Sequence, residues 1–125
     1  MKPQPRHVLV VDDNEIVRTV MQIALEDAGY RVHQAADGRM ACAWLDGHRP
    51  VSCVVCDLSM PHADGHAVLE HLRSTPAYQG VPALVVSTDT RAETRAAVRQ
   101  EGARAYISKP CNPGDLVAAV NRLCA

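Results

Sequence analysis

The stretch SCVVCDLSMPHADG, residues 52–65, decides the fold that this sequence predicts. Its apolar run from Cys53 to Cys56 is typical of a strand buried on both faces, as in a parallel sheet. The run ends in the carboxylate of Asp57, and a loop with a proline and a glycine follows. Ligands of open α/β sheets bind outside the carboxyl ends of the strands, which is where Asp57 stands. The stretch alone is equally compatible with an aspartate that caps a turn, so the other strand ends must decide.

Outward from this stretch, short apolar strands alternate with helical patterns five times. The predicted strands are residues 8–11, 31–35, 53–56, 83–87 and 105–108, the weakly apolar second one at a sheet edge. The predicted helices are residues 16–28, 39–46, 66–73, 91–101 and 115–124. Asn14 is expected to cap the first helix and Gly29 to end it. This alternation predicts an α/β fold, a doubly wound sandwich of three layers around a parallel sheet.

For two of the predicted helices, the sequence also predicts which residues face the core. The helix at 39–46 is expected to turn Met40, Ala43 and Trp44 inward. The helix at 91–101 has few and small inward candidates, namely Ala92, Ala96, Ala97 and Val98. Because little apolar contact opposes its displacement, this helix and the strand after it are expected to form a moving surface.

Length and charge favour one ordinary globular domain. The chain has 125 residues, which is enough for a substantial core, and residues 7–125 are expected to form it after a short extension, residues 1–6. A net charge of −1 gives no reason to expect binding to nucleic acid or to an acidic membrane. No apolar run approaches the roughly 20 residues that span a bilayer, and the start lacks a signal-peptide core. A cytoplasmic location is therefore expected.

Cys53 and Cys56 form a CxxC pattern, which suggests a redox or zinc motif. Their odd separation within one strand sends the two side chains to opposite faces of the sheet. Redox CxxC motifs lie at helix starts, and zinc needs two further ligands at suitable spacing. Core thiols are therefore favoured for this pair.

Polar side chains also follow the other predicted strands. They are Asp12-Asp13 after the first strand, Asp57 after the third, Ser87-Thr88 after the fourth and Lys109 after the fifth. The carboxyl ends of parallel strands share one edge of the sheet, so these groups should converge on one crevice. The three carboxylates would repel one another, and the ammonium of Lys109 or a bound metal ion can relieve that repulsion. Oxygen ligands of this kind suit Mg²⁺.

Lys109 is one of only two lysines in the chain, against eleven arginines. A flexible ammonium suits a single oxyanion. A carboxylate next to a metal ion, a lysine and a hydroxyl is a receptor for a phosphoryl group, with the carboxylate as nucleophile. Mg²⁺ and Lys109 would stabilise the equatorial oxygens during in-line transfer. This interpretation is favoured over a chance cluster at four strand ends.

As a set, these motifs resemble the receiver domain of bacterial two-component response regulators, in the CheY-like superfamily. The resemblance covers essentially the whole chain and rests on Asp12-Asp13, Asp57 with Met60-Pro61 and Asp64-Gly65, Ser87, Tyr106 and Lys109-Pro110. It implies a flavodoxin-like (βα)5 fold with strand order 2-1-3-4-5. It also implies a signalling switch in a phosphorelay, which catalyses only its own phosphorylation and dephosphorylation and is not an enzyme in the wider sense.

The resemblance implies a role for each acidic residue. Asp57 would accept a phosphoryl group from a histidine kinase or a phosphotransfer protein. Mg²⁺ would bind directly to Asp13, Asp57 and the backbone carbonyl of Ser59, with Asp12 acting mainly through water. No direct contact with nucleic acid or membrane is expected, and the domain would be a monomer or a weak, phosphorylation-dependent dimer.

The resemblance also covers the residues around the acceptor. Ser87 and Lys109 would each contact a phosphoryl oxygen, and the Lys109–Pro110 peptide would be cis. Tyr106 would be the switch aromatic whose rotamer follows Ser87, with a plain strand aromatic as the alternative. Thr88 is bulkier than the Ala or Gly usual there and is expected to restrict access to Asp57. Cys111 stands where Phe is often found, which leaves the packing of the last strand–helix junction open.

Two other classes remain as alternatives. An aspartate-nucleophile Mg²⁺ phosphatase of the haloacid-dehalogenase type would need an Asp-x-Asp at its first strand, which Asp12-Asp13 and Asp57-Leu58-Ser59 do not supply. A flavodoxin-like cofactor binder would need a Gly- or Ser/Thr-rich phosphate loop after the first strand. The acidic run Asp12-Asp13-Asn14-Glu15 would repel a phosphate at that place.

Overall fold

A computed structural model describes residues 5–47, 50–58 and 64–125, and strands and helices alternate through them. The strands are His7–Val11 (β1), Arg31–Ala35 (β2), Cys53–Asp57 (β3), Ala83–Ser87 (β4) and Ala103–Ser108 (β5). The helices are Glu15–Asp27 (α1), Gly38–Asp46 (α2), Gly65–Ser74 (α3), Ala92–Gln100 (α4) and Pro113–Leu123 (α5). A short 3₁₀ helix, Pro76–Tyr78 (η1), follows α3. Every predicted strand and helix is present, with its ends within two residues of the predicted ones.

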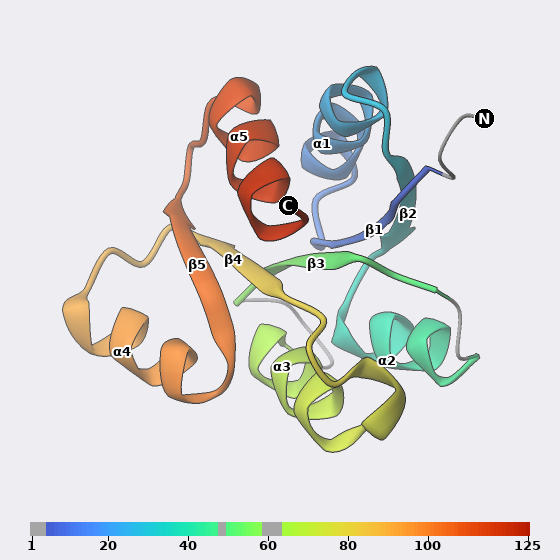
Figure 1. The fold of residues 1–125 in the computed structure, drawn as a ribbon. Coiled ribbons are helices and arrows are strands. Elements are labelled where there is room, and N and C mark those ends of the chain that lie inside the picture. Colours follow the sequence, from blue (N-terminus) through green and yellow to red (C-terminus); the bar gives the residue numbers. More distant parts are fainter. Residues whose placement is uncertain (1–4, 48–49, 59–63) are drawn as a thin grey trace.

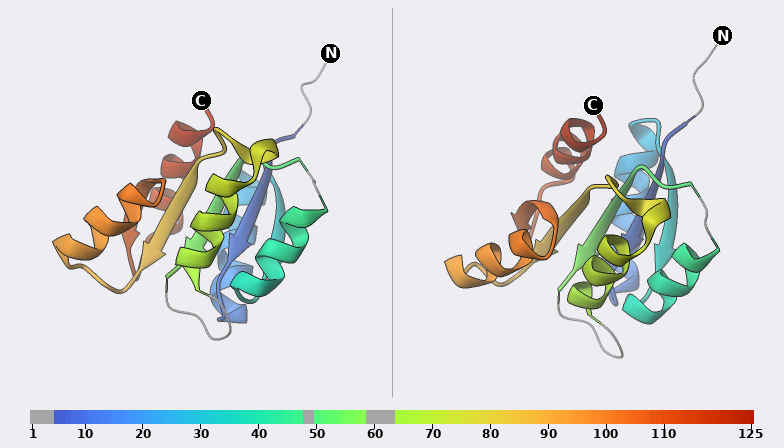
Figure 2. Two further views of the ribbon diagram at one scale, coloured as in Figure 1. Left: turned by 90° about the horizontal axis from the view of Figure 1, so that it is seen from below. Right: turned by 60° about the horizontal axis from the view of Figure 1, so that its bottom comes forward.

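The five strands pair in parallel in the order β2-β1-β3-β4-β5, which confirms the order implied by the resemblance and the edge position of β2. In the central pairs Val11 lies opposite Cys56, and Asp57 lies opposite Val86. The carboxyl ends of β1, β3 and β4 therefore lie side by side. Figure 2 shows this edge at the bottom of its left view, with the end of α5 at the opposite side of the sheet.

Helices cover both faces of the sheet, α1 and α5 on one face and α2, α3 and α4 on the other (Figure 1). Alternate residues of β3 face the two layers: Val54 and Cys56 enter one core cluster, and Cys53 and Val55 enter the other. Both cysteines are fully buried, which confirms that they are core thiols on opposite faces. Among the described residues no helix is long and apolar enough to cross a membrane.

The local signals at helix ends act as predicted. The Asn14 side chain accepts a hydrogen bond from the Val17 N–H at the start of α1, which satisfies an amide that lacks a partner in the helix. Gly29 follows the end of α1 with a φ of 99°, a conformation that favours glycine.

The predicted inward faces of α2 and α4 need correction. In α2 the buried residues are Gly38, Ala41 and Leu45. Met40 is 52% exposed and Ala43 is exposed as well, so only Trp44 of the predicted set packs against the core. In α4 only Val98 is buried, and the three alanines predicted to face inward, Ala92, Ala96 and Ala97, are exposed. Short sequences of small residues do not fix the rotation of a helix, since several faces have similar apolarity.

The predicted helical spacing of α1 is correct, but the apolar residues on it divide between two faces. Met21 and Leu25 are buried against the sheet and α5. Ile16, Val20 and Ile23 are 75%, 47% and 57% exposed. The helix therefore presents large apolar side chains away from the core.

Candidate functional site

Four strands carry the predicted polar groups to one edge of the sheet. Asp12 directly follows β1, Asp57 ends β3, Ser87 ends β4 and Lys109 directly follows β5. One carboxylate oxygen from each of Asp12, Asp13 and Asp57 lies within 4.8 Å of the other two. The structure thus brings together the described residues that the sequence predicts to converge.

Asp12 is the most buried member of the cluster, with 1% of its surface exposed. Lys109 Nζ donates to its Oδ2 at 2.6 Å, and the Asn14 N–H donates to its Oδ1 at 2.9 Å. The Arg18 guanidinium donates to the Asp12 backbone carbonyl at 2.6 Å. A buried carboxylate is tolerated when it is paired and hydrogen-bonded, and these contacts meet both conditions.

Lys109 joins two of the carboxylates, because its Nζ also lies 3.2 Å from Asp57 Oδ2. Burial by itself lowers the pKa of Lys109, but the hydrogen bond and charge of Asp12, followed by those of Asp57, outweigh burial and raise it. Lys109 is therefore an ammonium throughout the neutral pH range. The Lys109–Pro110 peptide is cis, as the resemblance implies.

The charge balance of the cluster bears on a metal ion. Three carboxylates against one ammonium leave two formal negative charges in a small volume. Asp13 is exposed, so one side of the cluster is accessible to solvent. Carboxylate oxygens that converge in this way are the ligands that Mg²⁺ prefers, and a dication would balance the charge. The acidic triad is thus typical of a Mg²⁺ site; Ser59, the predicted carbonyl ligand, lies outside the described residues.

A hydrogen-bonded chain leads from Ser87 to β5. Ser87 is 2% exposed, and its Oγ accepts a hydrogen bond from the Asp89 N–H at 3.1 Å. The Asp89 backbone carbonyl in turn accepts a hydrogen bond from the Tyr106 hydroxyl. Ser87 and Tyr106 are therefore linked through the backbone of Asp89, a residue that the sequence interpretation missed. Nothing in its sequence neighbourhood distinguishes it, because the link depends on how β5 lies beside β4.

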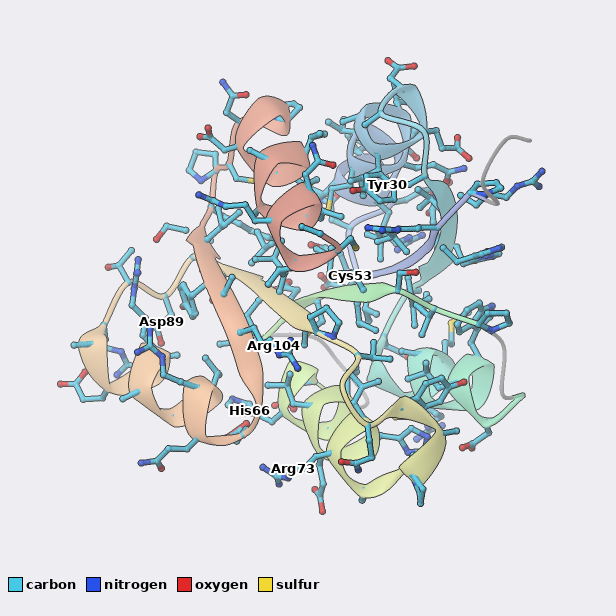
Figure 3. All side chains as sticks on the ribbon, viewed as in Figure 1. Tyr30, Cys53, His66, Arg73, Asp89 and Arg104 are labelled. Atoms are coloured by element: carbon cyan, nitrogen blue, oxygen red, sulfur yellow. The ribbon has the colours of Figure 1, made fainter. Side chains whose placement is uncertain are left out.

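The side chain of Asp89, labelled in Figure 3, holds the loop before α4 by several hydrogen bonds. The Asp89 carboxylate accepts hydrogen bonds from Arg91 and, at 2.7 Å, from the Thr94 hydroxyl. The hydrogen bonds from Arg91 hold the pKa of the Asp89 carboxyl below its usual range. The hydrogen bond from Thr94 lowers it further. The Arg95 guanidinium lies 4.7 Å from the centre of the Tyr106 ring. The described structure thus connects Tyr106 to both the loop and α4.

Asp64 and Gly65 pack the start of α3 against the end of β3. The Asp64 side chain caps the helix by accepting hydrogen bonds from the His66 and Ala67 N–H groups. A Cβ on residue 65 would overlap the backbone carbonyl of Asp57, so only glycine permits this approach. The Asp64-Gly65 motif was visible in the sequence, but the steric reason for it is visible only in the structure.

An apolar groove of about 400 Å³ lies between α1 and α5, next to the acidic cluster. Its lining includes Ile16, Val20, Thr88, Lys109 and Pro110. Thr88 is exposed, and Lys109 belongs to both the groove and the acidic cluster. The groove therefore borders the edge of the sheet that carries the cluster. That Thr88 restricts access to Asp57 stays a prediction.

The sequence matches the response regulator receiver domain family over residues 8–121. The chain belongs to that family. It is a phosphorelay signalling domain and not a true enzyme, which decides against the phosphatase and the flavodoxin-like cofactor binder. Receiver domains are phosphorylated by histidine kinases.

Individual relatives place this receiver in proteins of different length. Response regulator Rre1 of Synechocystis is 35% identical over 123 residues, which are 98% of this chain and 53% of Rre1. Two-component response regulator ORR3 of Oryza sativa is 31% identical over 98% of this chain and 90% of its own length. The chemotaxis protein CheY4 of Vibrio cholerae superposes with a TM-score of 0.90 at 32% identity, covering 96% of this chain and 99% of that chain. The receiver thus spans about half of Rre1 and nearly all of CheY4.

Proposed function

We propose that Asp57 of this receiver accepts a phosphoryl group from a phosphohistidine on a histidine kinase or a phosphotransfer protein. The observation that carries the proposal is the position of its carboxylate, 3.2 Å from Lys109 Nζ and beside those of Asp12 and Asp13. Asp57 ends the central strand of the sheet, between β1 and β4. Groups from both neighbouring strands can therefore reach a phosphoryl group attached to it.

In the proposed transfer, an Asp57 carboxylate oxygen attacks phosphorus and a P–O bond forms as the P–N bond of the donor breaks. The imidazole nitrogen of the donor keeps the electron pair of that bond and takes a proton from solvent. Lys109 shifts from Asp57 to a phosphoryl oxygen, while Asp12 continues to orient its ammonium. The Ser87 hydroxyl oxygen accepts a hydrogen bond from the Asp89 N–H, and its O–H donates a hydrogen bond to another phosphoryl oxygen.

Asp13, Asp57 and the Ser59 carbonyl would hold Mg²⁺. When bound, the ion would neutralise charge on the phosphoryl oxygens. The ion pair between Asp12 and Lys109 supports an indirect role for Asp12, through water, because its Oδ2 is already engaged. The remaining formal charge of the cluster supports a dication in preference to a monovalent ion.

Phosphorylation is proposed to change the surface formed by α4, β5 and α5. A Ser87 hydroxyl drawn to the phosphoryl group would pull on the Asp89 N–H, and the Asp89 carbonyl would pass that movement to Tyr106. The access role of Thr88 and the switch role of Tyr106 belong to the same proposal.

The apolar groove between α1 and α5 is proposed to receive the histidine-bearing helix of the phosphodonor. A donor must bring its phosphohistidine to Asp57, and the groove shares Lys109 with the acceptor cluster. Exposed Ile16 and Val20 on α1 continue this apolar surface. Residues 7–125 would act as one domain after the extension 1–6, as a monomer or a weak, phosphorylation-dependent dimer without direct nucleic-acid contacts.

The direct test is labelling by acetyl phosphate in the presence of Mg²⁺, followed by intact mass. The wild type should gain one phosphoryl group, whereas Asp57→Asn keeps the shape but loses the nucleophile and should label at least about 100-fold more slowly. Asp115→Asn, an equal charge change on the exposed first turn of α5, is the matched control and should label normally. A phosphoryl group on Asp12 or on a serine of the wild type would refute Asp57 as acceptor.

A further inference from the structure

Two thiols meet at the end of the sheet remote from the acidic cluster. Cys53 is the first residue of β3 and is fully buried. Cys124 ends α5 and packs, partly buried, against the core cluster that contains Cys53. Its Sγ lies 3.8 Å from the Ser52 carbonyl oxygen, at the peptide that joins Ser52 to Cys53. Figure 3 shows Cys53 close to the end of α5, with Tyr30 nearby.

The Cys53 and Cys124 thiols belong to the same core cluster and affect each other's pKa. The interaction with Cys124 and burial both raise the pKa of Cys53. The interaction with Cys53 lowers the pKa of Cys124 against the effect of burial, and the charge of Arg6 and the nearby Tyr30 lower it further. Burial instead raises the pKa of the remaining thiols, Cys42, Cys56 and Cys111. Among the described cysteines, Cys124 is thus the one whose pKa is lowered, and its side chain is only partly buried.

We propose that Cys124 is a modification site for peroxide, and that Cys53 resolves the oxidised form into an intramolecular disulfide between β3 and α5. The position of Cys124 Sγ, 3.8 Å from the carbonyl oxygen of the peptide that leads into Cys53, supports this pairing. A disulfide requires the two sulfurs to approach to about 2.05 Å. Cys124 is the cap residue of α5, beyond the last helical residue Leu123. Cys56, the other member of the CxxC pattern, faces the opposite core and takes no part.

The chemistry balances with hydrogen peroxide as the oxidant. The Cys124 thiolate attacks one peroxide oxygen, the O–O bond breaks, and the departing hydroxide takes a proton to leave as water. The resulting sulfenic acid is attacked by the sulfur of Cys53. The S–S bond forms as the S–O bond breaks, and hydroxide leaves with the Cys53 proton as a second water. Overall, two thiols are oxidised by two electrons and one peroxide is reduced to two waters.

The bridge would tie the end of α5 to the sheet and close the long loop between Cys53 and Cys124. Such a link constrains the unfolded chain, so the oxidised protein should unfold at a higher temperature than the reduced protein. Asp57, the proposed phosphoacceptor, lies at the other end of β3 from the bridge.

The test is to oxidise the wild-type chain with equimolar hydrogen peroxide at pH 7 and to map its peptides by mass spectrometry. The expected product is a monomer lighter by two hydrogens, with a Cys53–Cys124 linked peptide that dithiothreitol separates. Under the same conditions Cys124 should be lost about ten-fold faster than Cys42, because a thiolate is the reacting form. This measurement needs no substitution and is independent of whether a variant folds.

Three variants sharpen the assignment. Cys124→Ser should abolish the fast reaction and leave Cys53 reduced, while Cys42→Ser, the matched control, should still form the bridge. Cys53→Ala should stop Cys124 at a sulfenic acid that a cyclic 1,3-dione traps. The proposal is overturned by a Cys124–Cys124 link between chains, by a wild-type Cys124 sulfinic acid with Cys53 reduced, or by Cys42 or Cys111 reacting as fast as Cys124.

Discussion

Among single residues, Asp12 differs from the two other carboxylates of the cluster in its burial and in its hydrogen-bond partners. Its two oxygens accept hydrogen bonds from Lys109 and the Asn14 N–H, and it is buried. Asp13 is exposed at the same cluster, and Asp57 ends the central strand. The environment therefore assigns Asp12 to orienting the ammonium, and leaves Asp13 to face solvent and any entering ion.

Asp13→Asn is expected to weaken divalent-ion binding by about ten-fold or more, equivalent to about 1.4 kcal/mol. The substitution removes one anionic ligand and one of the two uncompensated negative charges of the cluster. Mn²⁺ is a suitable paramagnetic probe, with affinity read from water relaxation or electron spin resonance. Asp27→Asn, an equal charge change at the end of α1, is the control and should bind normally. An unchanged affinity in Asp13→Ala or Asp13→Asn would remove Asp13 from the metal site.

Gly65→Ala is expected to destabilise the domain by about 1–3 kcal/mol and to slow phosphorylation by acetyl phosphate. The added Cβ would overlap the Asp57 backbone carbonyl, so either β3 or the start of α3 must move. Gly114→Ala is the control, because its Cβ would meet only the Asn112 side chain, at 3.1 Å. Urea unfolding and labelling rates check both effects. Equal midpoints for Gly65→Ala and the wild type would show that the close approach is not needed.

Among the elements, α4 is the helix held least firmly by the core. Val98 is its only buried residue, and the helix contacts β5 at the edge of the sheet. The Asp89 N–H donates a hydrogen bond to Ser87 Oγ, and the Asp89 carbonyl accepts one from the Tyr106 hydroxyl. These two bonds link the loop before α4 to the edge of the sheet that carries the acidic cluster. Moving a two-state equilibrium from 1:99 to 99:1 takes about 5.5 kcal/mol, and charge-assisted hydrogen bonds contribute roughly 1.5–3 kcal/mol each. Bonds from Ser87 and Lys109 to a phosphoryl group would therefore supply about half or more of such a shift.

Tyr106→Phe is expected to uncouple α4 from the acceptor. In the wild type, beryllofluoride with Mg²⁺ should change amide exchange mainly in residues 87–109. Removing the Tyr106 hydroxyl deletes the bond to the Asp89 carbonyl, so the change over α4 should fall to less than about half. Tyr78→Phe is the matched control, because it also deletes a hydroxyl-to-carbonyl bond, to Leu45, outside this chain of contacts. Exchange changes confined to α1 and α2 would place the output surface elsewhere.

Over the whole molecule, the two faces of the sheet have different surfaces. The face covered by α1 and α5 carries the apolar groove that borders Lys109, together with exposed isoleucines. The other face carries α4 at its edge (Figure 1). A phosphodonor and a downstream target would therefore meet different parts of the domain.

Ile16→Asp is expected to slow phosphotransfer from a kinase by about ten-fold, because a charge in the groove would oppose burial of an apolar helix. Labelling by acetyl phosphate should be unchanged, since this small donor needs no protein surface. Ile23→Asp is the matched control: Ile23 is 57% exposed on the same helix and does not line the groove. The measurement uses the kinase that labels the wild type fastest in a panel. Equal losses for both variants, or for both donors, would contradict docking at the groove.

The sequence by itself determined the order of the elements and the identity of the acidic site. Short apolar strands, caps such as Asn14 and stops such as Gly29 act over a few residues, so their signals are readable in a linear sequence. Asp12, Asp57 and Lys109 were predictable as a group because parallel strands place all their carboxyl ends at one edge.

Only the tertiary structure decided the contacts between these groups and the rotation of the weakly amphipathic helices. Asp12 pairs with Lys109, 97 residues away, and the Asp89 link to Tyr106 depends on how β5 lies beside β4. The exposure of Ile16 and Ile23 on α1, and of the alanines on α4, likewise depends on which neighbours cover each helix. The physical reason is that hydrogen bonds and burial act over a few ångströms in space, whereas sequence patterns report only on neighbours along the chain.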